Sequence, residues 1–122
     1  MTDYGPQLDS FRHYSYVLSG QRTATVTVQL CQAPWPGRVA NPAANARASG
    51  GTTPTLTVDL QVGATSKLAS AMTVNATPVW VSGTPAADPS VAAGDDLEVV
   101  LTIGGTNPTW DDVVVEFDLV RT

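Results

Sequence analysis

The feature that most constrains the fold is an alternation of inward apolar residues with mostly polar residues in four segments, 23–30, 55–62, 97–103 and 113–120. A period of two is typical of a β-strand that buries one face and exposes the other. Each segment therefore predicts a strand that contributes one face to the core of a sheet protein. The expected inward residues are Ala24, Val26, Val28, Leu30, Leu56, Val58, Leu60, Val62, Leu97, Val99, Leu101, Ile103, Val113, Val115, Phe117 and Leu119.

Weaker strand signals lie at residues 14–18, 38–40, 71–74 and 79–81, and turn signals rich in Gly, Pro and Ser separate the predicted strands. About eight short strands, each with one polar face, are typical of an all-β antiparallel β-sandwich, and we expect it to be jelly-roll-like. The Ala-rich segment 42–48 is short, so we interpret it as a loop or a single helical turn.

The length of 122 residues is typical of one domain with a single core. Within it we expect residues 1–22 to form an extended N-terminal arm with a first short strand, and residues 23–122 to form the β-sandwich domain. The single cysteine, Cys31, allows no internal disulfide, so stability must come from packing or from partner subunits.

The charge pattern argues against two classes of partner. The net charge is −5, and the six basic residues are scattered singly along the chain, whereas a phosphate backbone is bound by clustered cations. We therefore expect no direct contact with nucleic acid. No run of about 20 apolar residues is present, so no membrane span is expected, and the N-terminus lacks the pattern of an export signal.

Aromatic residues gather near the N-terminus, where Tyr4, Phe11, Tyr14 and Tyr16 make up half of the aromatic residues in the chain. Aromatic side chains are enriched at protein interfaces, so this arm could dock on a neighbouring protein. Alternatively, the arm lies across its own sandwich and seals one open end of the core. The sequence leaves both interpretations open.

Three valines fall on predicted polar strand faces: Val100, Val114 and Val120. Singly exposed apolar residues are common on protein surfaces. The same pattern also fits a sheet face that another subunit covers, and the sequence does not decide between the two.

The sequence contains no residue pattern typical of catalysis. The only histidine, His13, has no second histidine or nucleophile near it, so we interpret it as an isolated surface residue. Strict alternation points Leu30 inward, so we expect Cys31 to point outward or into the next loop, without the basic partner that a reactive thiol requires. We expect no enzymatic activity and no cofactor.

Two aspartate pairs, Asp95–Asp96 and Asp111–Asp112, each precede a strong predicted strand. Loop carboxylates can bind calcium, but the spacing of known calcium loops is absent. An Asp that follows a Gly in a turn usually caps backbone N–H groups. We therefore interpret these residues as turn formers and expect no bound metal.

The stretch LCQAPWPGRV, residues 30–39, ends the first strong strand abruptly. Pro34 and Pro36 lack a backbone donor and fix φ, so the ladder of hydrogen bonds must stop there. Trp35 is thereby held on a stiff corner, where its ring either caps the open end of the sandwich or anchors a neighbour. Gly37 lets the chain turn into the next strand.

Three blocks resemble a family of small jelly-roll structural proteins of tailed phages: the strand that runs into the Ala-Pro-Trp-Pro element, the segment 55–72, and the Ala-Ala-Gly-Asp turn into a strand at 91–101. The resemblance covers roughly residues 23–122 and rests on turn and strand patterns. It implies a non-catalytic role in the virion as a head decoration, cement, fibre or minor structural protein. The chain departs from the family at Gly37, where members often have a cysteine.

From the resemblance we expect a capsid cement or decoration protein on the outer capsid surface, synthesised in the host cytoplasm. Its expected partners are the major capsid protein lattice and further copies of the chain, as a homotrimer. The expected interface residues are Tyr4, Phe11, Tyr14, Tyr16 and Trp35. The alternative is a tail or head-fibre module that binds a host receptor or carbohydrate, with Trp80 and Trp110 as platforms for sugar rings.

Overall fold

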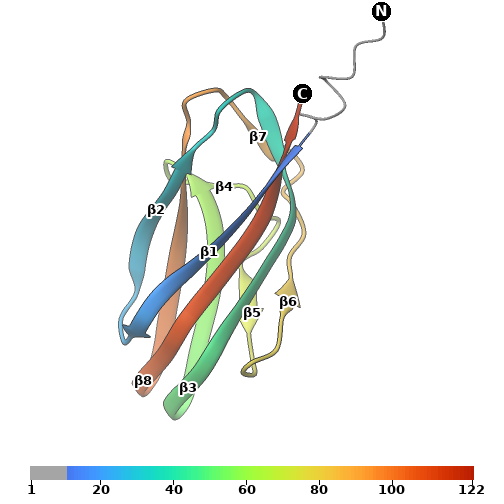
Figure 1. The fold of residues 1–122 in the computed structure, drawn as a ribbon. Helices are drawn as coiled ribbons and strands as arrows, with labels where there is room; N and C mark the ends of the chain where they lie inside the picture. The colour runs from blue at the N-terminus through green and yellow to red at the C-terminus, as the bar shows by residue number, and fades with distance from the viewer. Residues whose placement is uncertain (1–10) are drawn as a thin grey trace, which may run out of the picture.

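The computed structural model describes residues 11–122, which form eight β-strands and no helix. Every strand pairing is antiparallel, so the predicted all-β antiparallel class is confirmed. In this described part, no helix is available that could cross a membrane. The strands, labelled in Figure 1, are β1 (Phe11–Arg22), β2 (Val26–Gln32), β3 (Gly37–Val62), β4 (Thr65–Ser66), β5 (Met72–Val74), β6 (Val81–Ser82), β7 (Ser90–Val91) and β8 (Asp96–Arg121).

The centre of the fold is one long ribbon in which β3 pairs with β8 along nearly its whole length. The register runs from Gly37 opposite Arg121 to Val62 opposite Leu97. Both strands bend midway, where the register shifts on either side of Thr52. Figure 1 shows the ribbon descending and then turning back on itself. Residues 49–51 and 104–108, which the sequence predicts as turns between strands, therefore lie within the continuous strands β3 and β8.

Two glycines allow this bend. Gly51 has a φ of 96° and Gly105 a φ of 111°, in the region that side chains with a Cβ rarely adopt. A Cβ at Gly105 would lie 2.6 Å from the carbonyl oxygen of Thr53, and one at Gly51 would collide with the carbonyl oxygen of Asn107. The two bent strands therefore approach each other more closely than residues with side chains would permit.

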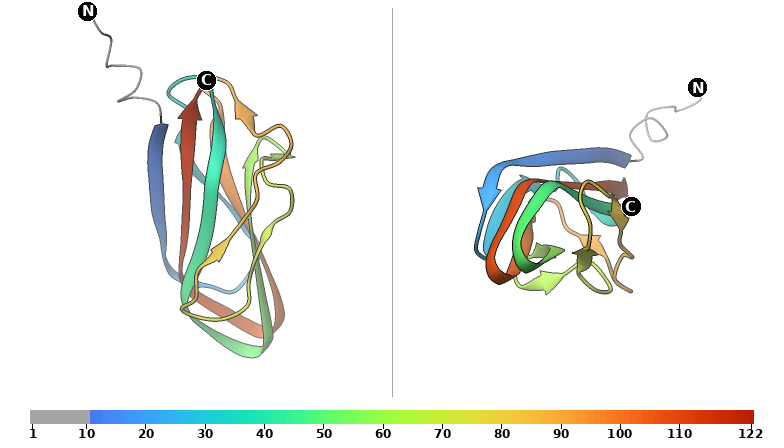
Figure 2. Two further views of the ribbon diagram at one scale, coloured as in Figure 1. Left: turned by 90° about the vertical axis from the view of Figure 1, so that its right-hand side faces the viewer. Right: turned by 90° about the horizontal axis from the view of Figure 1, so that it is seen from below.

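The bend places the two halves of the ribbon face to face, so that the molecule has two layers (Figure 2). The remaining strands extend these halves at their edges. This arrangement is compatible with the predicted sandwich, while the jelly-roll assignment stays a prediction. The first layer contains β1, β6, β7 and residues 109–121 and 37–50 of the ribbon, and the second layer contains β2, β4, β5 and residues 97–104 and 55–62.

The core lies between the layers and consists largely of the residues that alternation pointed inward. The fully buried ribbon residues include Leu56, Val58, Leu60, Leu97, Val99, Leu101, Val113, Val115, Phe117 and Leu119. Each such side chain contributes about 1.5–3 kcal/mol to stability through removal from water. The segment 23–30 is less buried than expected, because Ala24 is exposed and its other inward residues are only partly buried.

Two expectations about local structure were wrong. Residues 42–48 are part of β3, where Ala44 and Ala46 are fully buried opposite Val115 and Val113. Pairing with β8 overrides the helical preference of alanine, as tertiary contacts commonly do. The first strand is also longer than predicted, because Ser19 and Gly20 form an irregularity in the register of β1 and do not end it.

Candidate functional site

Two of the predicted interface residues, Tyr14 and Tyr16, lie on the inner side of β1. Tyr14 is opposite Phe117 in the register with β8, and the centroids of these two rings are 5.2 Å apart. The centroids of the Tyr14 and Tyr16 rings are 6.1 Å apart in a stacked arrangement. Both rings are partly buried against the core, so this part of the arm covers its own sandwich. Tyr4 lies outside the described residues.

Trp35 occupies the corner after β2 and is also partly buried against the core. The guanidinium carbon of Arg121 lies 5.7 Å from the centre of the Trp35 ring, which is within the range of a cation–π contact. The backbone N–H of Thr122 donates to the carbonyl of Pro36 at 3.1 Å. These two contacts hold the Pro-Trp-Pro corner against the end of β8, as we expect if the Trp35 ring caps the open end of the sandwich.

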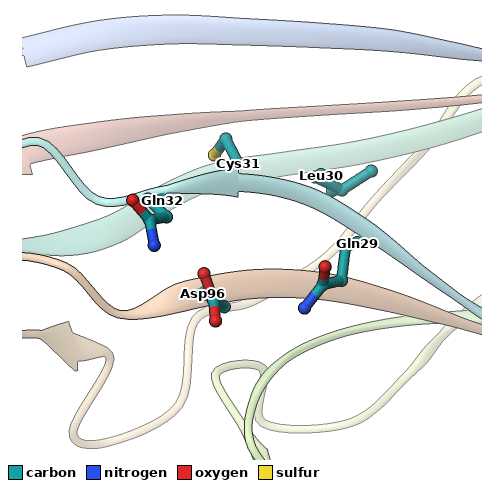
Figure 3. Close-up of a pocket in the computed structure, with 5 residues that line it drawn as sticks. All are labelled: Gln29, Leu30, Cys31, Gln32 and Asp96. Carbon is teal, nitrogen blue, oxygen red and sulfur yellow. The ribbon is translucent and has the colours of Figure 1, made fainter.

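Cys31 points inward, so its predicted outward direction was wrong. The register between β2 and β8 shifts between Gln29 and Cys31, which places Cys31 opposite the buried Leu97. A β-bulge at Leu30 therefore reverses the alternation by one residue. Figure 3 shows the side chain of Cys31 on the other side of β2 from that of Gln29.

The environment of Cys31 makes its thiol a poor nucleophile. Burial raises the pKa of the Cys31 thiol, and the neighbouring hydroxyl of Tyr16 only partly opposes this effect. Burial, followed by the interaction with Cys31, also raises the pKa of Tyr16. Because only the thiolate is reactive, a raised pKa keeps the sulfur in its unreactive form at neutral pH.

A shallow depression of about 420 Å³ lies over the end of β2 and the start of β8. Gln29, Gln32 and Asp96 supply its polar groups, and Leu30 and Cys31 complete the lining (Figure 3). The lining contains one carboxylate and no aromatic ring, so it has neither a pair of catalytic acids nor a platform for a sugar. Among residues 11–122, no cluster of three or more potential metal ligands is present.

The aspartates beside the strong strands make turn and ion-pair contacts. The carboxylate of Asp95 accepts a hydrogen bond from the N–H of Ala92 at 2.8 Å. Asp112 accepts from the N–H of Gly20 at 2.8 Å and from Nε of Arg47 at 2.7 Å. The contact of Asp95 agrees with our interpretation of it as a turn former. For Asp111 and Asp112 that interpretation was wrong, because both lie within β8 and pair with Arg47. The hydrogen bonds from Arg47 and from the N–H of Gly20 lower the pKa of Asp112.

His13 has a partner that the sequence does not reveal. Its Nδ1 lies 2.7 Å from Oδ1 of Asp118 on the outer face of the first layer. The other carboxylate oxygen of Asp118 accepts a hydrogen bond from the side-chain amide of Asn41 at 3.0 Å. The interpretation of His13 as an isolated residue was therefore wrong, because strand pairing brings together two residues that are remote in sequence.

The large apolar side chains that remain exposed lie in two regions. The β1 patch denotes Phe11 and Val17, which are 55% and 60% exposed and lie apart on the outer face of β1, with His13 and Ser15 between them. The 79–80 patch denotes the sequence neighbours Val79 and Trp80, which are 53% and 48% exposed. The patches lie at opposite edges of the first layer, because β1 pairs with β8 while β6, which follows Trp80 directly, pairs with β3.

Trp110 does not belong to either patch. It is only 1% exposed, so its predicted role as a sugar platform was wrong. Sequence reasoning also missed the exposure of Val17 and Val79. The exposure of Val17 could have been predicted from the sequence, since Val17 lies between Tyr16 and Leu18, both of which alternation points inward.

Comparisons with known proteins add little. No protein-family model and no curated protein matches the sequence. Among solved structures, a chain in the structure of infectious bursal disease virus, Gx strain, aligns with 92% of this chain at 11% identity and a TM-score of 0.27. This chain spans 41% of the length of that viral chain. A similarity at this level supports neither a shared family nor a shared function.

Proposed function

We propose that this protein is a non-catalytic structural component of a tailed-phage virion, which binds the major capsid protein on the outer surface of the head as a cement or decoration protein. The resemblance of residues 23–122 to small phage structural proteins supports this assignment, and so does the all-β fold. The observation that carries it is the presence of two exposed apolar patches at opposite edges of one small layer.

A protein that joins neighbouring subunits needs at least two separate contact surfaces, and the two patches offer one for the capsid lattice and one for a further copy of the chain. Copies that bind only the assembled shell stabilise it by mass action, without any bond being made or broken. A shell offers many equivalent binding positions. A weak contact that is repeated at each of them therefore increases the resistance of the whole shell to internal pressure. The net charge of −5 would also keep coated particles apart in solution.

We assign the contact with the major capsid protein to the 79–80 patch. Trp80 is the most exposed tryptophan of the chain, and tryptophan is the residue type most enriched among the side chains that dominate binding energy. Val79, its neighbour in sequence, is also exposed and adds apolar surface to this region.

The experiment is a binding assay with purified heads of the phage that encodes this chain, from which the chain has been removed. Wild-type protein should co-sediment with the heads. Trp80→Ala should weaken binding by at least about tenfold, as expected for the loss of a central aromatic anchor. Gln29→Ala, an exposed residue of the second layer, serves as the control and should bind as wild type does. Absence of wild-type binding would contradict the proposed function.

The exposed Trp80 ring also favours a second candidate, a fibre module that binds a receptor or carbohydrate, since sugars stack on exposed aromatic rings. A glycan array distinguishes the two candidates. Saturable binding of a sugar that is lost in Trp80→Ala, together with no binding to heads, would support the second candidate and refute the first. The homotrimer that we expect from the resemblance remains a prediction, and the edge of β1 argues for a dimer in its place.

A further inference from the structure

The outer edge of β1 is open along the part of the strand that pairs regularly with β8. In the described structure β1 lies at the end of the sheet order, with β8 as its neighbour. From Phe11 to Leu18 the register is uninterrupted. This stretch contains no proline, no lysine and no acidic residue, so it lacks most of the devices with which proteins protect an open edge from pairing, and Arg12 near its start is the one permanently charged residue that it carries. A weakly protected edge of this length is suited to accept another strand.

We propose that the occupant of this edge is β1 of a second copy of this chain, paired antiparallel about a two-fold axis at Tyr14. In this register Phe11 lies opposite Val17 of the partner subunit, and Val17 lies opposite Phe11 of the partner subunit. The first layers of the two copies then form one continuous sheet. This inference does not depend on the proposed capsid role, because it follows from the edge alone.

The side chains of β1 are self-complementary in this register. On the outer face, both exposed residues of the β1 patch become covered, since each meets the other across the axis. His13 meets Ser15 of the partner subunit, so no like charges are opposed. On the inner face, Arg12 meets Tyr16 of the partner subunit, and a guanidinium over a phenol ring is a favourable pair. Such isologous contacts are the commonest way in which identical chains associate.

Neighbouring registers are less favourable. A shift of the partner by two residues in one direction places His13 opposite its own copy and Phe11 opposite Ser15. A shift in the other direction places Phe11 opposite Ser19, in the irregular part of β1 between Leu18 and Gln21. Only the register centred on Tyr14 pairs both exposed apolar residues with each other. The order of side chains along β1 therefore matches β1 of a second copy better than it matches an unrelated strand.

The test is sedimentation equilibrium of the full chain over a range of concentrations. Wild-type protein should form a dimer. Val17→Lys, which places a charge opposite Phe11 of the partner subunit, should raise the dimer dissociation constant by more than about tenfold. Val79→Lys is the matched control, because Val79 is a valine of similar exposure in the other patch, and its dissociation constant should remain that of wild type.

A compensating variant tests the register and separates the interface from folding. Phe11→Glu combined with Val17→Lys creates two opposite-charge pairs across the axis and should restore dimerisation that Val17→Lys alone has lost. A wild-type monomer at all concentrations, a trimer, or equal effects of Val17→Lys and Val79→Lys would overturn the proposal. Binding to phage heads is measured independently through Trp80→Ala, so failure of the dimer and failure of the capsid role give different results.

Discussion

The side chains of Tyr16 on β1 and Cys31 on β2 lie next to each other, close enough for each to shift the pKa of the other. These two strands are edge strands of different layers, and each pairs with β8 in a different half of the ribbon. The contact therefore joins the layers at the side of the molecule where neither layer continues. The sequence predicts unrelated roles for these two residues, an interface anchor for Tyr16 and a thiol that points outward or into a loop for Cys31.

The first prediction concerns the energy of this contact. Tyr16→Phe keeps the stacked ring but removes the hydroxyl beside Cys31, so the free energy of unfolding should fall by about 0.5–1.5 kcal/mol if the hydroxyl donates to the sulfur. Cys31→Ala in the Tyr16→Phe background should then cost less than it does in wild type, because the interaction with the hydroxyl is already lost. Urea denaturation of the four proteins of this cycle measures the coupling. Tyr14→Phe is the control, and additive effects of Tyr16→Phe and Cys31→Ala would contradict the contact.

The second prediction concerns the reactivity of the thiol. Because burial raises the pKa of Cys31, the folded protein holds less thiolate at a given pH than the unfolded chain does. Alkylation by iodoacetamide should therefore be slower in the native protein, and its pH profile should be displaced to higher pH than in urea. The rate is followed by mass spectrometry. A native profile at or below that of the unfolded chain would show that the sulfur points to solvent.

The third prediction concerns acid stability. The hydrogen bonds from Arg47 and from the N–H of Gly20 lower the pKa of Asp112 in the folded state. A lowered pKa stabilises the protein at pH values above that of the unfolded carboxyl, and this stabilisation disappears as the pH falls through the folded pKa. Arg47→Ala should consequently reduce the melting temperature at pH 7 and have a smaller effect near pH 2.

The measurement for this prediction is the melting temperature of Arg47→Ala and of wild type between about pH 2 and pH 7, the range in which carboxyl groups titrate. Arg38→Ala removes a charge from another exposed position of β3 and serves as the control, whose effect should change less with pH. A constant difference between Arg47→Ala and wild type across the range would mean that Asp112 does not act through its charge.

The fourth prediction concerns the bend of the ribbon. Gly51→Ala should reduce the free energy of unfolding by more than about 2 kcal/mol, since it combines an unfavourable φ with a collision. Gly63→Ala is a matched control, because Gly63 also has a positive φ but has no atom within 4 Å of the added Cβ. Its cost should be about 1 kcal/mol. Equal costs at the two positions in urea denaturation would show that the ribbon tolerates a wider bend.

Much of the core could be predicted from sequence, because the ribbon strands are long enough for alternation to persist. Leu56, Val99 and Phe117 are buried as their period predicts. The Ala-rich part of β3 could not be predicted in this way, because small side chains carry a weak period and the strand forms only when it pairs with β8. The bulge at Leu30 is likewise invisible to alternation, and a single inserted residue sufficed to reverse the direction of Cys31.

The surface was harder to predict than the core. Aromatic content alone suggested Tyr14, Tyr16 and Trp35 as anchors, yet these rings are packed against their own chain. Composition does not distinguish an aromatic that closes a small core from one that is exposed to a partner. The pairing of His13 with Asp118 depends on the register between β1 and β8, which a single sequence does not specify.

The dependence of three strands on β8 has a consequence for how this chain reaches its native state. Because β1, β2 and β3 all pair with β8, a nascent chain cannot complete either layer until β8 has left the ribosome. Val62 and Leu97 are the paired residues of the ribbon that lie closest in sequence. Even after β8 is available, the segment between them must form a closed loop before further pairs of β3 and β8 can form. Folding of this topology is accordingly slow, on the order of milliseconds to seconds, as is typical of proteins dominated by contacts between distant residues.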